Sequence, residues 1–75
     1  MSSYRMVQVV DLDPGDRIEL PEGLLTVAEA PGFYTGVDPT NPQKKVLAIA
    51  AKNAMGRRRY VRVPDWKYKV LRRGH

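Results

Sequence analysis

Cysteine is absent from the 75 residues, so the chain can form no disulfide bond and no thiolate site. Histidine occurs once, as the final residue His75, where chain ends commonly fray. The sequence also lacks a glycine-rich phosphate loop and a serine placed beside a base. These are the usual means of catalysis and metal binding, so we expect a protein that is not an enzyme, with no catalytic residue, metal site or cofactor.

Long apolar runs are missing as well. The longest covers residues 46–51, far short of the roughly 20 residues that a membrane span needs. The first twelve residues lack the basic start and apolar block of a signal peptide. We therefore expect a cytoplasmic protein without membrane contact. Its length predicts a single domain over residues 1–75, with a loose start at residues 1–4.

Acidic residues are almost absent from the second half of the chain. Residues 39–75 hold eleven cations and one acid, whereas residues 1–38 hold two cations and seven acids, so the halves carry net charges of +10 and −5. This asymmetry predicts an anionic partner, or an acidic face that meets a basic face within the chain or in a neighbour. The alternative is that the cations only keep the strands soluble.

The first half has the pattern of short strands separated by turns. Alternating or β-branched segments, typical of strands, cover residues 5–12, 17–20 and 24–30. Between the first two lies the sequence DPGD. It predicts a tight turn, because Pro14 presets its own φ and Gly15 accepts the positive φ that a type II turn requires.

Residues 42–55 have two interpretations. A helix is indicated by Asn41 as a cap, Pro42 at the first position and Gly56 as a stop, which would make the fold α+β. A strand is indicated by apolar residues on both alternating faces. The next segment, RRRYVRV, has a clear strand pattern, and a short glycine-containing loop would join the two as a hairpin. The hairpin is the favoured interpretation, and it makes the fold all-β.

The end of the chain resembles a known fold family. In YVRVPDWKYKVL, a proline and a short segment that suits one 3₁₀ turn join two strands, as at the end of SH3 domains. VVDLDPGDRIEL is similar to the opening of SH3-like and KOW-type barrels, although the next glycine comes only at Gly23. The resemblance covers most of residues 9–73. It implies an all-β, single SH3-like five-stranded small barrel with a 3₁₀ turn before the last strand, a build common among small basic proteins of bacteria and phages.

The candidate binding site lies in residues 53–74, where eight cations and three aromatic rings surround a single acid, Asp65. Guanidinium groups bind phosphate in a bidentate manner, and aromatic rings beside cations stack on bases. We therefore predict weakly specific binding of DNA or RNA, held mainly by phosphate attraction. The predicted contact residues are Arg57, Arg58, Arg59, Tyr60, Arg62, Lys67, Lys69, Arg72 and Arg73.

Other partners fit the same composition. A second interpretation is a protein–protein interaction module, such as a bacterial or phage accessory factor that docks on an acidic protein surface. A third is a homo-oligomer that associates acidic face to basic face. Peptide-binding SH3 domains carry an acidic, aromatic-rich groove, and the basic half of this chain departs from that pattern.

Trp66 is the single tryptophan in a chain without disulfides. We expect it to plug the open end of the barrel, because a small core needs large apolar side chains. Stacking of Trp66 on a nucleic-acid base is the alternative.

Overall fold

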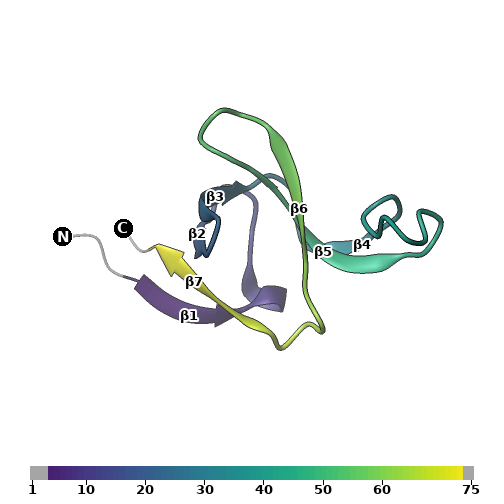
Figure 1. The fold of residues 1–75 in the computed structure, drawn as a ribbon. Helices are drawn as coiled ribbons and strands as arrows, with labels where there is room; N and C mark the ends of the chain where they lie inside the picture. The colour runs from purple at the N-terminus through teal and green to yellow at the C-terminus, as the bar shows by residue number, and fades with distance from the viewer. Residues whose placement is uncertain (1–3, 74–75) are drawn as a thin grey trace.

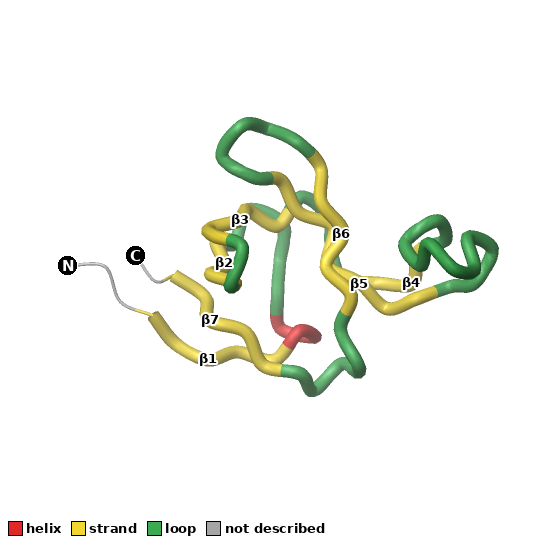
Figure 2. The backbone as a smooth tube through the Cα atoms, in the orientation of Figure 1, coloured by secondary structure: helices red, strands yellow, loops and turns green. Residues whose placement is uncertain are grey.

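The computed structural model of the chain describes residues 4–73, which form an antiparallel seven-stranded sheet that curls into a half-barrel (Figure 1). Within these residues the single helical element is the 3₁₀ turn η1 (Val9–Asp11) (Figure 2). The strands are β1 (Tyr4–Gln8), β2 (Arg17–Leu20), β3 (Gly23–Val27), β4 (Gly32–Tyr34), β5 (Val46–Lys52), β6 (Arg58–Arg62) and β7 (Lys69–Arg73).

The prediction of an all-β fold is confirmed. β5 occupies the segment for which a helix was the alternative, and it pairs with β6 as the expected hairpin. The sheet has seven strands rather than five, partly because β4 is only three residues long and too short to show an alternating pattern. Tyr4 already belongs to β1, while residues 1–3 of the predicted loose start and His75 lie outside the described residues. No helix within the described part is long and apolar enough to cross a bilayer.

The strands are ordered β1-β7-β2-β3-β5-β4, and β6 pairs with β5 outside this path. Within the described part of the chain, β1, β4 and β6 therefore have a single neighbouring strand each. The register places apolar residues opposite one another on the inner face, as in the pairs Ile18–Leu25 and Ile49–Val61. Such cross-strand pairs are the unit from which a sheet gains its stability.

The predicted tight turn is present. The N–H of Asp16 donates to the carbonyl of Asp13 at 3.1 Å, and Gly15 has a φ of +95° that other residues rarely adopt. In the β5–β6 loop, the Asn53 side-chain oxygen accepts bonds from the N–H groups of Met55 and Arg57, each at 2.9 Å. Asparagine commonly closes turns by bonding the backbone ahead of it, and here it sets the hairpin.

The turn before the last strand closes in a similar way. The N–H of Tyr68 donates to the Asp65 carbonyl at 3.3 Å, a bond between residues three apart, and the N–H of Lys67 donates to the Asp65 carboxylate at 2.8 Å. The resemblance to SH3 domains implied a 3₁₀ turn at this place. The 3₁₀ helix proper lies at the other end of the chain, in η1, whose Val9 N–H donates to the Tyr68 carbonyl at 2.8 Å.

The core is aliphatic. β5 crosses the middle of the fold and is buried on both faces, which is why three of its seven residues are alanine. Short side chains allow strands and loops to approach from both sides. The remaining space is filled by branched side chains, and the core cluster consists of Val9, Leu12, Ile18, Leu25, Val27, Leu47, Ile49, Ala51, Val63 and Val70.

Trp66 is not part of this core, and the prediction that it plugs the barrel is wrong. Its side chain is 38% exposed, and its ring packs edge-on against Phe33 with centroids 6.1 Å apart. Phe33 lies in β4 and Trp66 lies in the turn between β6 and β7, so the two rings meet outside the core cluster. The aliphatic residues already fill the interior, so the turn between β6 and β7 leaves its indole outside.

Candidate nucleic-acid interface

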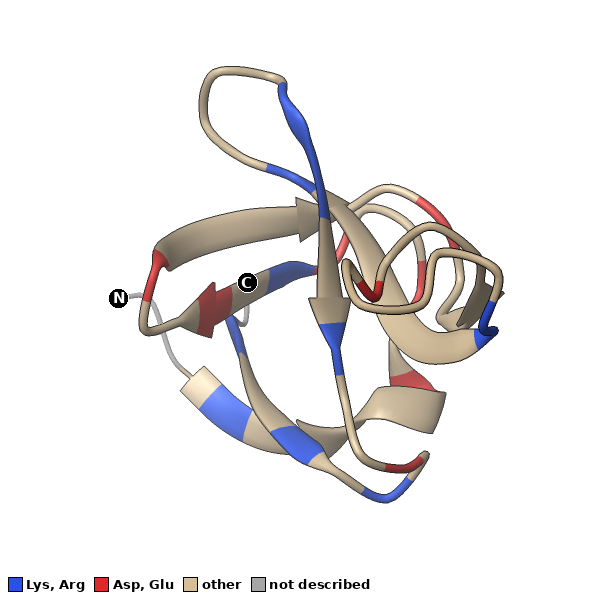
Figure 3. Cartoon of the chain, turned by 45° about the vertical axis from the view of Figure 1, so that its right-hand side comes forward, with Lys and Arg blue, Asp and Glu red and all other residues tan. Residues whose placement is uncertain are grey.

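The β5–β6 hairpin carries five of the predicted contact residues. Because Val61 points into the core opposite Ile49, the two-residue alternation of a strand puts Arg58, Tyr60 and Arg62 together on the other face. This arrangement was expected from the sequence, and the register confirms it. Figure 3 shows the hairpin end projecting from the body of the fold with its cations in blue.

Two of the hairpin arginines are paired with acids from the first half of the chain. Arg58 lies 3.4 Å from the carboxylate of Glu29, and Arg59 lies 2.8 Å from that of Glu22. Arg58 also donates a bond to the Tyr60 hydroxyl at 3.3 Å, and this bond, together with the Glu29 charge, raises the pKa of Arg58. The acidic and basic halves of the chain therefore meet within one molecule, as one interpretation of the charge asymmetry predicted.

Tyr60 is partly occupied by the protein itself. Its ring lies 5.2 Å from that of Tyr34, with the two planes tilted by 54°. The Tyr34 hydroxyl donates to the Ala30 carbonyl at 3.2 Å, and its pKa is raised by burial and by the nearby Glu29 carboxylate. Tyr60 is thus available for stacking only on the part of its ring that Tyr34 leaves free.

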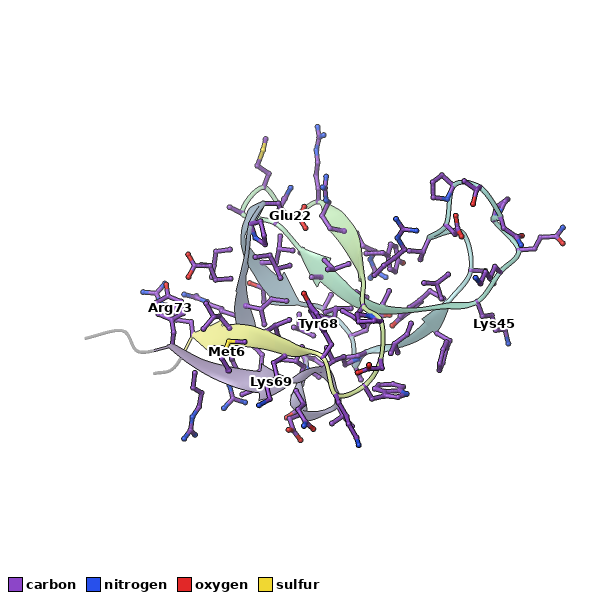
Figure 4. The ribbon with its side chains drawn as sticks, turned by 60° about the horizontal axis from the view of Figure 1, so that its bottom comes forward. Met6, Glu22, Lys45, Tyr68, Lys69 and Arg73 are labelled. Carbon is purple, nitrogen blue, oxygen red and sulfur yellow. The ribbon has the colours of Figure 1, made fainter. Side chains whose placement is uncertain are left out.

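β7 carries three more of the predicted contacts, Lys69, Arg72 and Arg73. Val70 is buried, so Lys69, Leu71 and Arg73 point to the outer face of the sheet. Figure 4 shows Lys69 and Arg73 along this strand. Within residues 4–73, neither cation has a carboxylate within ion-pair distance.

Cations stand opposite cations at one end of this sheet. Arg5 of β1 pairs in register with Arg72 of β7. β2 pairs with β7 through Ile18 opposite Arg72, and continuing that register brings Arg17 opposite Arg73. These four residues, Arg5, Arg17, Arg72 and Arg73, are called the arginine cluster below. By strand alternation Arg5 and Arg72 lie on the Val70 side of the sheet, and Arg17 and Arg73 lie on the outer face with Lys69. Among the described residues, Asp16 is the one acid that contacts the cluster, at 3.8 Å from Arg72.

Sequence reasoning missed half of this cluster. Arg5 and Arg17 lie in the acidic half of the chain, far in sequence from the basic stretch, and only strand pairing brings them beside β7. The sequence signal that could have identified them is that they are the two cations among the seven acids of residues 1–38. The predicted contacts themselves are divided between the hairpin and β7, with Lys67 in the turn that joins the two.

No protein-family model, curated protein or solved structure matches this chain. In residues 4–73, no three His, Cys, Asp or Glu side chains gather as metal ligands would. The candidate site consists of cations and aromatic rings on a sheet, and cations of this kind are suited to holding an anion.

Proposed function

We propose that this protein binds nucleic acid without acting as an enzyme, through the arginine cluster and Lys69. The supporting observation is the opposition of like charges in the sheet. Arg5 and Arg72 face each other directly, an arrangement that destabilises a sheet. A chain with eight acids has residues that could neutralise these positions, yet the cluster contacts one of them. Phosphate groups would relieve the repulsion and gain charge-assisted hydrogen bonds.

A polyanion fits the cluster better than a single small anion does. Lys69 and Arg73 share a face and are four residues apart, about 13 Å along an extended strand. One phosphate cannot span that length, whereas a nucleic-acid backbone repeats its charge along it. Tyr4 lies opposite Arg73 and is 45% exposed, so a base has an aromatic surface to stack on beside the cations. Contacts of this kind carry little sequence preference.

An acidic protein surface is the second candidate partner. It is favoured by an apolar row on the same outer face, where Met6 lies opposite Leu71 and both are exposed. A nucleic-acid backbone leaves such side chains without a partner. A protein segment that combines apolar and acidic residues would contact both the row and the surrounding cations.

The proposal extends to location and fold family. We place the protein in the cytoplasm, where a chain without cysteine needs no disulfide and where nucleic acid is accessible. We also propose that the half-barrel belongs to the SH3-like class and serves as a bacterial or phage accessory protein. The strand, proline, turn and strand that end the chain support this assignment.

The salt dependence of binding tests the proposed function. Labelled single-stranded DNA, single-stranded RNA and duplex DNA are titrated with the protein between about 50 and 200 mM salt. The double variant Arg17→Gln/Arg73→Gln should reduce the slope of log K against log salt by about 1.4 for single strands, or 0.7 for each lost phosphate contact. Arg59→Gln is the matched control, because Glu22 already pairs with Arg59 and the slope should hardly change.

Two results would reject the proposed function. One is the absence of binding to all three nucleic acids at the lowest salt concentration. The other is a slope that the double variant and Arg59→Gln lower equally. Binding of an acidic, apolar peptide under conditions where nucleic acid does not bind would support the second candidate.

A further inference from the structure

Among residues 4–73, some strand edges of the half-barrel have no paired neighbour, and these edges differ in how well they are protected. Charged side chains are the usual protection against pairing with another chain. β6 carries three arginines among its five residues, and β4 is only three residues long. β1 is five residues long and has a single charge, Arg5, while Met6 is 55% exposed. β1 is therefore the least protected long edge.

The backbone groups that β1 turns to its open side can be identified. The N–H of Val9 donates to the Tyr68 carbonyl of the β7 side at 2.8 Å. Because the bonding direction alternates along a strand, Val7 and Arg5 also direct their N–H and C=O groups toward β7. The groups of the other residues of β1, namely Tyr4, Met6 and Gln8, point to the open edge.

We infer that β1 pairs with β1 of a second copy of this chain, antiparallel and centred on Met6. In this register Met6 faces Met6 of the second copy, Tyr4 faces Gln8, and Arg5 faces Val7. Tyr4, Met6 and Gln8, whose backbone groups point to the open edge, then face one another across the two copies, so their N–H and C=O groups can form the bonds of an antiparallel ladder. A shift by one pair toward the N-terminus would instead set Arg5 against Arg5. The charge pattern therefore excludes that shift, and the centred register is the one that uses all five residues of the strand.

The outer face favours the same arrangement. Met6 lies opposite Leu71, and both side chains are exposed in the single chain. In the pair of chains, the row continues as Leu71 and Met6 of one copy followed by Met6 and Leu71 of the other. Apolar surface that each chain exposes is thereby partly removed from water. In this register the Arg5 residues of the two copies are diagonal neighbours rather than a directly opposed pair, and the other arginines of each cluster lie on β7 and β2, away from the junction.

This inference goes beyond the proposed function and does not depend on it. Its consequence for binding is that two arginine clusters would belong to one continuous sheet. A polyanion long enough to reach both would then bind more tightly through an effective concentration of the second site.

Cysteine cross-linking tests the register directly. The chain has no cysteine, so a disulfide in a single-cysteine variant must join two copies. Residues at a hydrogen-bonded antiparallel position have Cα atoms about 5.5 Å apart, within the range that a disulfide spans. Under mild oxidation without nucleic acid, Met6→Cys should cross-link at least about tenfold faster than Arg62→Cys on the exposed β6 edge, a rate ratio equivalent to about 1.4 kcal/mol. Equal rates, or faster cross-linking of Arg5→Cys than of Met6→Cys, would overturn the inference.

Sedimentation tests the pairing without a covalent bond. Met6→Pro removes an N–H that points to the open edge and leaves the bonds between β1 and β7 in place. Arg62→Pro is the matched change at the β6 edge, where the neighbouring Val63 N–H donates to Leu47 and the Arg62 N–H points outward. The unaltered protein and Arg62→Pro should form dimers as the concentration rises, and Met6→Pro should remain monomeric with an unchanged circular dichroism spectrum.

A second variant covers the case in which proline unfolds the chain. Met6→Lys sets two ammonium groups opposite each other in the centred register and should also give a folded monomer. An unaltered protein that stays monomeric at every concentration, or a Met6→Lys variant that still dimerises, would show that β1 does not pair with itself.

Discussion

Replacing Arg5 with glutamine should make the protein more stable and a weaker binder at the same time. Arg5 faces Arg72 across the β1–β7 ladder, is exposed, and contacts no acid among the described residues. Arg72 is the less suitable site for this test, because its replacement would also remove the contact with Asp16. Arg5→Gln therefore removes repulsion without removing an attractive contact.

The size of the gain follows from the geometry of the pair. Residues directly opposite in an antiparallel sheet have Cβ atoms about 5 Å apart, and flexible guanidinium groups turn away to about 7 Å. Two like charges at that distance in water repel by about 0.6 kcal/mol, less once salt screens them. We expect Arg5→Gln to raise the free energy of unfolding by about 0.5 kcal/mol, which corresponds to about 2–4 °C in Tm for a chain of this size.

Thermal and urea unfolding, each at low and high salt, measure this gain, and titration with labelled single strands measures binding. The gain should fade near 1 M salt, where the screening length is about 3 Å. Arg57→Gln is the matched control, since Arg57 lies in the β5–β6 loop outside any cross-strand pair of cations. A loss of stability in Arg5→Gln, or unchanged binding alongside the gain, would refute the view that the cluster is kept for an anionic ligand.

Two further predictions concern single side chains. Trp66→Ala should lower the free energy of unfolding by only about 1–2 kcal/mol, because the partly exposed indole makes an edge contact with Phe33. Ile49→Ala should lower it by about 2–5 kcal/mol, because Ile49 is fully buried. Equal losses in urea unfolding would show that Trp66 belongs to the core. The Thr40 hydroxyl, 2.7 Å from the Asp38 carboxylate, lowers the pKa of Asp38 below its ordinary value of 3.8, so the stability that this bond contributes is complete above pH 3.8 and is lost as pH falls through the lowered pKa. Thr40→Ala should move the pKa of Asp38 back toward 3.8 in an NMR titration, and an unmoved pKa would show that the hydroxyl is not the main cause.

Local sequence pattern was sufficient for most of the strands and for the turn at residues 13–16. The two-residue alternation of a strand depends only on neighbouring residues, so the sequence correctly predicts that Arg58, Tyr60 and Arg62 share one face. The turn at Gly15 was equally local, because proline and glycine restrict or permit φ wherever they occur. Predicting the hairpin at 46–62 also required weighing the helix signals of residues 42–55 against the strand pattern of the segment that follows.

The candidate site was only partly within reach of such reasoning. A run of cations in the sequence indicates an anionic partner, but it does not show which cations are already neutralised. Glu29 and Arg58 are 29 residues apart, and Glu22 and Arg59 are 37 residues apart. Contacts over those separations depend on how strands are ordered in the sheet, and no local periodicity encodes that order.

By itself, the sequence determined that this chain is all-β, where most of its strands run, and that its charge is divided between an acidic and a basic half. The tertiary structure decided what that charge does. Pairing of β1 and β2 with β7 brought Arg5 and Arg17 out of the acidic half to stand against Arg72 and Arg73, and curling of the sheet filled the interior with aliphatic residues and left Trp66 outside. The physical reason is the range of the forces involved: backbone preference acts between neighbours, whereas burial and charge act between whichever residues the closed sheet brings together.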